Sequence, residues 1–167
     1  MIKIRHALKS DIFQVYDLWE YLLEDEAETL QTKKNYPGVD SDQKETMNRF
    51  AKDFNKVLKN PSACLIVAEE HGILVGYVKA NVGERPLGNP RFFLMIQEAY
   101  TMPEYRKTPQ VISSLDAALD SWAEELEKKY DTKLPTRELI AISSPTQIKR
   151  WRRKGWTPYA VMFWRER

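Results

Sequence analysis

Cysteine and histidine are scarce in this sequence. Its 167 residues contain one cysteine, Cys64, and two histidines, His6 and His71. One cysteine excludes an internal disulfide framework, and three such side chains are too few for a Cys/His zinc site, so we expect no metal. Cys64 lies within the apolar residues 63–68, where a buried structural thiol is expected in preference to a nucleophile.

Long apolar runs are also absent. No segment approaches the roughly 20 apolar residues of a membrane-spanning helix, and the first residues, MIKIR, lack the basic-then-apolar pattern of a secretory signal. A content of 43% hydrophobic and 30% charged residues is typical of soluble globular proteins. We therefore expect one cytoplasmic domain over residues 1–167, a monomer or homodimer, with no membrane partner.

The sequence has little net charge. A value of +2 is too small to favour nucleic acid as an obligatory partner. Residues 149–154, KRWRRK, nevertheless concentrate cationic side chains, as either a solvated face or an anion site. Trp151, Trp156 and Trp164 alternate with arginines near the end of the chain. Such a pattern fits a base-stacking surface, but a terminal helix with arginine stems over apolar surface is favoured.

Glycine is missing where a phosphate loop would need it. Residues 96–119, IQEAYTMPEYRKTPQVISSLDAAL, begin as an alternating strand, pass a proline and two cationic residues, and continue as an amphipathic helix. A strand leading to a helix N-terminus is a frequent arrangement for binding phosphate. Phosphate loops usually carry glycines, because a residue without Cβ lets the backbone approach the anion, and none lies between Gly88 and Gly155.

Hydrophobic periodicity predicts a mixed α/β sheet flanked by helices. Residues 70–72 form a polar link typical of a hairpin turn, and residues 29–43 lose periodicity around Pro37 and Gly38. Strands are expected at residues 2–7, 63–69, 73–82, 91–101, 137–143 and 159–165, and helices at residues 9–26, 44–58, 108–129 and 144–155. Ser10 or Asp11 is the expected N-cap of the first helix. The order is β-αα-ββ-β-α-β-α-β, within one domain.

Three segments carry a resemblance to a known family. They are residues 2–18, IKIRHALKSDIFQVYDL, as a first strand and helix; residues 65–80, LIVAEEHGILVGYVKA, as a central hairpin with Gly76 before the outgoing strand; and residues 96–107, IQEAYTMPEYRK, as a fourth strand and loop. In this order and spacing they resemble the GNAT superfamily of acyl-CoA N-acyltransferases. The resemblance implies the single-domain GNAT fold, acetyl-CoA or a related thioester as donor, and a small-molecule or peptide amine as acceptor.

The resemblance also implies a donor site. In the family the fourth strand splays from its neighbour, which frees backbone groups for the amides of pantetheine, and Thr101 and Met102 hold those positions here. The pyrophosphate then lies on the following loop and the start of the next helix. The residues implied there are Arg106, Lys107, Thr108, Pro109, Gln110, Val111 and Ile112.

This loop departs from the family pattern, which has small residues where Pro109 and Val111 stand. Pro109 removes one donor but suits the first position of a helix capped by Thr108. Val111 is expected to bring a branched side chain towards the phosphates, while Lys107, Thr108 and Gln110 offer compensating donors. Two alternatives stay open: a loop that binds CoA and a loop that no longer binds it well.

Glu98 matches a strand position where many family members carry a carboxylate, and it is the candidate general base. The alternative is a structural Glu98 that faces solvent or pairs with Lys79 or Arg91. Strand alternation would turn Gln97 to the opposite face.

A general acid is harder to identify. The family's tyrosine position holds Trp151, whose indole cannot donate a proton at useful pH. Tyr159 is the candidate replacement and Tyr100 a second one, while thiolate also leaves without an acid. The competing function is a catalytically silent binding module whose basic C-terminal helix contacts an acidic partner or nucleic acid.

Overall fold

The computed structural model describes residues 1–30, 43–84, 91–107, 109–132, 134 and 137–139. Its strands are β1 (Lys3–His6), β2 (Ala63–Glu70), β3 (Ile73–Glu84), β4 (Phe92–Thr101) and β5 (Arg137–Leu139). Its helices are α1 (Ile12–Leu30), α2 (Gln43–Lys59) and α3 (Pro109–Tyr130), with 3-10 turns η1 (Lys9–Asp11) and η2 (Pro103–Tyr105). The predicted helix at residues 144–155 and strand at residues 159–165 lie outside the described residues.

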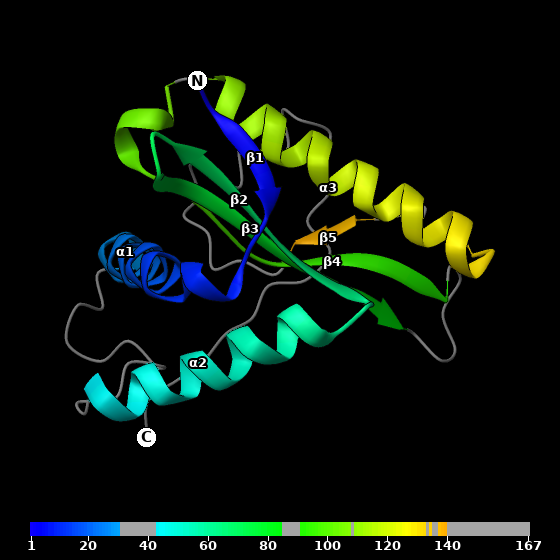
Figure 1. The fold of residues 1–167 in the computed structure, drawn as a ribbon, viewed down its shortest axis with the longest axis horizontal. Helices are drawn as coiled ribbons and strands as arrows, with labels where there is room; N and C mark the ends of the chain where they lie inside the picture. Colours follow the sequence, from blue (N-terminus) through cyan, green and yellow to red (C-terminus); the bar gives the residue numbers. More distant parts are fainter. Residues whose placement is uncertain (31–42, 85–90, 108, 133, 135–136, 140–167) are drawn as a thin grey trace.

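The strands form one mixed sheet in the order β1-β2-β3-β4-β5. Neighbours are antiparallel from β1 to β4, and β5 pairs with β4 in parallel. Helix α3 covers one face of the sheet, and α1 and α2 lie on the other (Figure 1). The predicted α/β architecture is confirmed.

Each face of the sheet has its own core. The residues that α3 buries repeat every three or four positions, as expected of one helical stripe, and pack on alternate strand residues. On this side they are Val111, Leu115, Leu119, Trp122 and Leu126 against Cys64, Ile66, Val78, Leu94 and Ile96. The core beneath α1 and α2 contains Val15, Leu18, Phe54, Val57, Leu65, Val67, Tyr77 and Tyr100. Cys64 is buried in the core under α3, as expected, and burial raises the pKa of its thiol to about 12.

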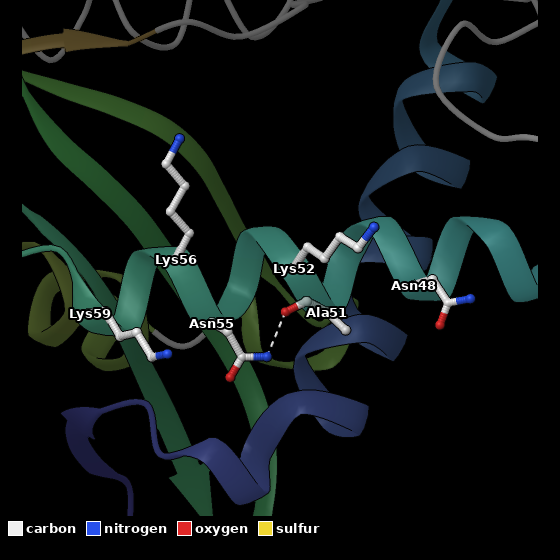
Figure 2. A pocket seen from close by; sticks show the side chains of 6 residues that line it. All are labelled: Asn48, Ala51, Lys52, Asn55, Lys56 and Lys59. Carbon is white, nitrogen blue, oxygen red and sulfur yellow. Dashed lines mark hydrogen bonds between the residues drawn. The ribbon is translucent and has the colours of Figure 1, made fainter.

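The outward face of α2 is rich in lysine. Lys52, Lys56 and Lys59 are exposed, and together with Asn48, Ala51 and Asn55 they line an open pocket of about 650 Å³ (Figure 2). The Asn55 side chain donates to the Ala51 carbonyl at 2.7 Å. A helical charge run of this kind is typical of a solvated face.

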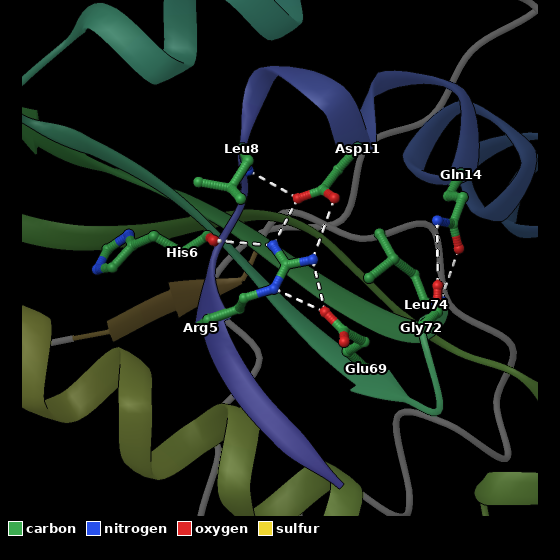
Figure 3. Close-up of polar contacts among 8 residues, drawn as sticks. All are labelled: Arg5, His6, Leu8, Asp11, Gln14, Glu69, Gly72 and Leu74. Carbon is green, nitrogen blue, oxygen red and sulfur yellow. Dashed lines mark hydrogen bonds and ion pairs between the residues drawn. The ribbon is translucent and has the colours of Figure 1, made fainter.

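A partly buried ionic cluster joins β1, η1 and β2. Arg5 contacts Asp11 at 2.6 Å and Glu69 at 2.7 Å, and the Leu8 backbone N–H donates to the Asp11 carboxylate at 2.7 Å (Figure 3). Asp11 is 5% exposed, so its charge is held by these partners in place of water. Asp11 stands immediately before α1, at one of the two positions expected for the N-cap, and its carboxylate accepts from the Leu8 backbone N–H at the start of the preceding 3-10 turn.

The β2–β3 hairpin is tied to α1. Gln14 accepts from the Leu74 backbone N–H at 2.8 Å and donates to the Gly72 carbonyl at 3.4 Å (Figure 3). His71 and Gly72 have φ values of 52° and 84°, a region that favours glycine in tight turns. The predicted hairpin is confirmed.

Candidate active site at the end of strand β4

A β-bulge places Glu98. Ile96 pairs with Ala80 and Glu98 with Lys79, so Gln97 is an extra residue in β4. Before the bulge, Ile96 lies in the core under α3; after it, Glu98 bonds to Tyr77, which lies in the core under α1 and α2. Strict alternation, on which the orientation of Gln97 was predicted, therefore does not hold here. Without the bulge, Glu98 would point into the core beneath α3.

Glu98 lies among polar groups at the edge of the second core. Its carboxylate is 3.3 Å from the Lys79 ammonium and accepts from the Tyr77 hydroxyl at 3.3 Å. Lys79 also contacts Asp53 of α2 at 2.5 Å. Burial opposes the charged form of Lys79, but the carboxylates of Glu98 and Asp53 outweigh it and raise the pKa of Lys79. Of the two pairings considered for Glu98, that with Lys79 is present, whereas Arg91 pairs with Glu84 at 2.6 Å.

Glu98 is nevertheless accessible. Its side chain is 25% exposed. A cavity of about 10 Å³, close to the size required for one water molecule, lies beside it and is lined also by Tyr77, Lys79 and residues of α1 and α2. Phe50 of α2 extends this lining into an aromatic cluster with Trp19, at a ring-centroid distance of 5.4 Å. A small polar group therefore has access to the carboxylate next to an apolar wall.

The end of β4 leaves one residue's backbone facing away from β3. The Met102 N–H donates to the Val75 carbonyl at 3.0 Å, and the Met102 carbonyl accepts from the Tyr105 N–H at 2.9 Å. Because groups alternate along an antiparallel ladder, the N–H and C=O of Thr101 point to the other edge of β4. Both backbone groups of Met102 are bonded within the protein, and the Thr101 carbonyl accepts from Arg106 Nε, so the predicted backbone groups reduce to the Thr101 N–H.

Gly76 permits this close approach of β3 and β4. It pairs with Thr101, and a Cβ at residue 76 would lie 2.8 Å from the Tyr100 carbonyl oxygen and 3.2 Å from the Thr101 hydroxyl. Glycine is therefore required for the strand spacing next to Thr101.

Arg106 is folded back over this strand end. Its Nε donates to the Thr101 carbonyl at 2.8 Å, its guanidinium lies 5.2 Å from the centroid of the Tyr100 ring, and it forms an ion pair with Asp25 of α1. The Tyr105 hydroxyl, one residue earlier, donates to Glu70 at 2.7 Å. These contacts attach the loop after β4 to both α1 and β2.

Helix α3 begins at Pro109, as predicted, and the expected cap Thr108 lies outside the described residues. Lys107 and Gln110 are exposed and Ile112 is half-buried. The N–H groups of a first helical turn have no intrahelical partner and are suited to an anion.

Val111 differs from expectation. Its side chain is 0% exposed and lies in the core under α3. The expectation that it points towards the phosphates is wrong, because residues 111, 115 and 119 share the apolar stripe that packs on the sheet. A branched side chain at residue 111 therefore leaves the backbone of the first turn accessible.

Two functional candidates escaped prediction. Asp25 lies in the acidic segment 24–28, EDEAE, which gives no sign of a contact with Arg106, 81 residues away. For Tyr77 the only available signal is its alternation with Lys79 in β3. Trp151, Tyr159 and the basic residues 149–154 lie outside the described residues.

Two kinds of feature are absent from the described part of the chain. Among those residues, no group of three or more His, Cys, Asp or Glu side chains is arranged to hold a metal ion. None of the helices described is both long enough and apolar enough to cross a membrane.

Comparison with known proteins points to one fold. No family model matches the sequence, and no curated protein matches it at a significant level. A predicted acetyltransferase from Clostridium acetobutylicum, solved with acetyl-CoA, has a TM-score of 0.68 and 18% identity, over 99% of this chain and 96% of that one. Glucosamine-6-phosphate N-acetyltransferase from Arabidopsis thaliana has a TM-score of 0.68 and 14% identity, over 99% of this chain and 98% of that one.

A third similar structure is an aminoglycoside 6'-N-acetyltransferase from Acinetobacter baumannii. Its TM-score is 0.68 at 12% identity, over 100% of this chain and 99% of that one. At sequence identities this low, structural similarity shows a shared fold alone. The chain therefore has the fold of the GNAT acetyltransferases along essentially its whole length.

Proposed function

We propose that the protein is an acyl-CoA-dependent N-acyltransferase that transfers an acetyl group from acetyl-CoA to a primary amine by direct attack. The observation that carries the proposal is the β4 bulge, which turns the Glu98 carboxylate to the face of the sheet that α1 and α2 cover. The end of the same strand leaves the Thr101 N–H facing away from β3, with the Thr101 carbonyl bonded to Arg106, and leads to the start of α3. Base and donor cradle thus come from one strand, and solved structures of the same fold include one with acetyl-CoA.

In this proposal the donor lies along the end of β4. A pantetheine amide carbonyl accepts from the Thr101 N–H, next to the half-buried side chain of Met102. The donor's pyrophosphate oxygens accept hydrogen bonds from the backbone N–H groups of Gln110, Val111 and Ile112. The side chains that donate to the pyrophosphate are those of Arg106, Lys107, Thr108 and Gln110. Pro109 starts the helix where no N–H is required.

The chemistry needs one base. Glu98 removes a proton from the acceptor ammonium, directly or through one water, and the neutral nitrogen attacks the thioester carbonyl. A C–N bond forms and the C–S bond breaks; CoA leaves as a thiolate and takes the proton released by the amide nitrogen, with Tyr159 as the candidate carrier. Lys79 also pairs with Asp53, so its ion pair with Glu98 is weakened.

The acceptor class stays open in this proposal. The similar structures include acetyltransferases named for aminoglycosides and for glucosamine 6-phosphate, both of which carry primary amines. The aromatic cluster around Phe50 and the carboxylate of Glu98 fit a cationic amine next to apolar surface.

A second candidate is a catalytically silent protein of the same fold. The observation that favours it is that Glu98 and Arg106 are both already in ion pairs, with Lys79 and Asp25. Residues 149–154 would then contact an acidic partner or nucleic acid.

Calorimetric titration with acetyl-CoA and CoA separates the two candidates. Binding, accompanied by a gain in unfolding free energy of about 2.7 kcal/mol at a hundred times the dissociation constant, is the expected result for the enzyme. Absence of any heat of binding to the folded protein would contradict it. An acceptor panel of polyamines, aminoglycosides, amino acids and peptides with free N-termini then tests turnover.

A further inference from the structure

Among the residues described, Arg106 is the one cation of the loop after β4 whose partners the structure defines. Its Nε donates to the Thr101 carbonyl at 2.8 Å, and its Nη2 donates to the Asp25 carboxylate. The flat guanidinium lies 5.2 Å from the centroid of the Tyr100 ring. Two of its five N–H donors and one of its faces are therefore engaged with groups of the protein itself.

The partner on α1 is also accessible. The side chains of Arg106 and Asp25 are each 39% exposed, so water and anions reach both. Exposed ion pairs of this kind are weak, because solvent screens them and two long side chains must be held in place. A pyrophosphate, with more negative charge and more acceptor oxygens than one carboxylate, is the stronger ligand for a guanidinium.

Asp25 then opposes an anionic donor in two ways. It competes for Arg106, because the guanidinium must turn from the carboxylate to reach a phosphate with the same N–H groups. It also places a negative charge beside Arg106 in the loop after β4, next to which the donor's phosphates would lie, and like charges repel. Both effects weaken the binding of the donor.

We propose that Asp25 is a positioning residue that holds Arg106 away from the donor's pyrophosphate and so sets the affinity of the site for CoA. This inference rests on the proposed function, because it assumes that the loop after β4 is the CoA site. It adds to that function a residue of α1 that acts on donor binding through Arg106. Removal of the Asp25 charge should change the affinity for CoA and leave the base, Glu98, unaltered.

The test compares Asp25→Asn with Glu24→Gln, titrated with CoA in the full-length protein. Asn keeps the shape of Asp25 and removes its charge. Glu24 is exposed on the same turn of α1, so Glu24→Gln removes an equal charge and is the matched control. We expect Asp25→Asn to tighten CoA binding by about threefold to tenfold, and Glu24→Gln to change it by less than about twofold. Arg106→Ala should weaken binding by about tenfold or more.

The double variant identifies the route of the effect. Combined with Arg106→Ala, Asp25→Asn should tighten CoA binding less than it does alone, because only the repulsion is left to remove. An equal gain in both backgrounds would overturn a role through Arg106.

Failure of the inference and failure of the proposed function differ in this experiment. If the parent protein binds CoA and Asp25→Asn binds it equally or more weakly, the inference is overturned and the proposed function stands. If only Asp25→Asn binds CoA, both are supported. If neither binds CoA while circular dichroism reports both as folded, the proposed function is overturned and the inference with it.

Discussion

Lys79 and Glu98 lie opposite each other on β3 and β4, with 3.3 Å between ammonium and carboxylate, only because Gln97 is an extra residue in β4. The pair gives Glu98 a fixed position and leaves its side chain partly exposed. Asp53 completes the cluster from α2. A carboxylate held in this way is suited to serve repeatedly as a base beside a bound amine.

Replacement of that carboxylate should separate chemistry from donor binding. If Glu98 is the base, Glu98→Gln lowers the rate of acetyl transfer by about 100-fold to 10,000-fold while CoA affinity stays nearly unchanged. Steady-state rates with an amine from the acceptor panel, together with CoA titration, measure both. Glu84→Gln is the control, since Glu84 is a β3 carboxylate paired with Arg91. Equal rates for Glu98→Gln and the parent protein would assign Glu98 to structure.

A methyl group at residue 76 should disturb both the fold and the donor site. Gly76→Ala places a Cβ 2.8 Å from the Tyr100 carbonyl oxygen, so β4 has to move next to Thr101. We expect a loss of about 1–3 kcal/mol in unfolding free energy, measured in urea, together with weaker CoA binding.

The control for this change lies at the hairpin turn. Gly72→Ala meets no atom within 4 Å but carries a φ of 84°, so it should also destabilise the protein. Its added Cβ contacts neither Tyr100 nor Thr101, so CoA affinity should stay unchanged. Weakened CoA binding in Gly72→Ala alone would contradict the link between Gly76 and the donor site.

Shortening the side chain of Val111 tests its orientation. Because this side chain is buried under α3, Val111→Ala should cost about 1–3 kcal/mol of stability and leave CoA affinity unchanged. A side chain directed at the phosphates would have the reverse signature, with CoA binding tightened and stability preserved. Urea denaturation and CoA titration of one variant decide between the two.

Asp11 should make the stability of the fold depend on acid pH. The hydrogen bond from Arg5 holds the pKa of Asp11 below its usual value, despite the opposing effect of burial. The carboxylate therefore stabilises the folded state above the unfolded pKa of about 4, and this contribution is lost as pH falls through the lower folded value.

Asp11→Asn should accordingly lower the unfolding free energy at pH 7 by about 1–3 kcal/mol and flatten its decline below pH 4. Urea denaturation at pH 7, 4 and 3 measures both effects. Glu45→Gln, in an exposed pair with Arg49, should change stability by about 0.5 kcal/mol or less. An unchanged acid profile in Asp11→Asn would place the acid sensitivity elsewhere.

Local pattern was enough to predict most of the elements. Period-two alternation and helical stripes located β1 to β4 and all three described helices to within a few residues, because side-chain burial on one face repeats with the geometry of each element. The hairpin at Gly72 and the helix start at Pro109 followed from backbone preferences of single residues. The spacing of residues 111, 115 and 119 also indicates that the side chain of Val111 is buried under α3, although the family pattern led to the prediction that it points towards the phosphates.

The chemistry of the site depends on contacts that no local pattern contains. The extra residue at Gln97 exists only relative to the register of β3, and it reverses the face on which Glu98 lies. Asp25 meets Arg106 across 81 residues because α1 and the loop after β4 come together at the same end of the sheet. Local periodicity records which side of an element is buried, whereas register and long-range ion pairs depend on how separate elements pack, and that packing is set by the whole chain at once.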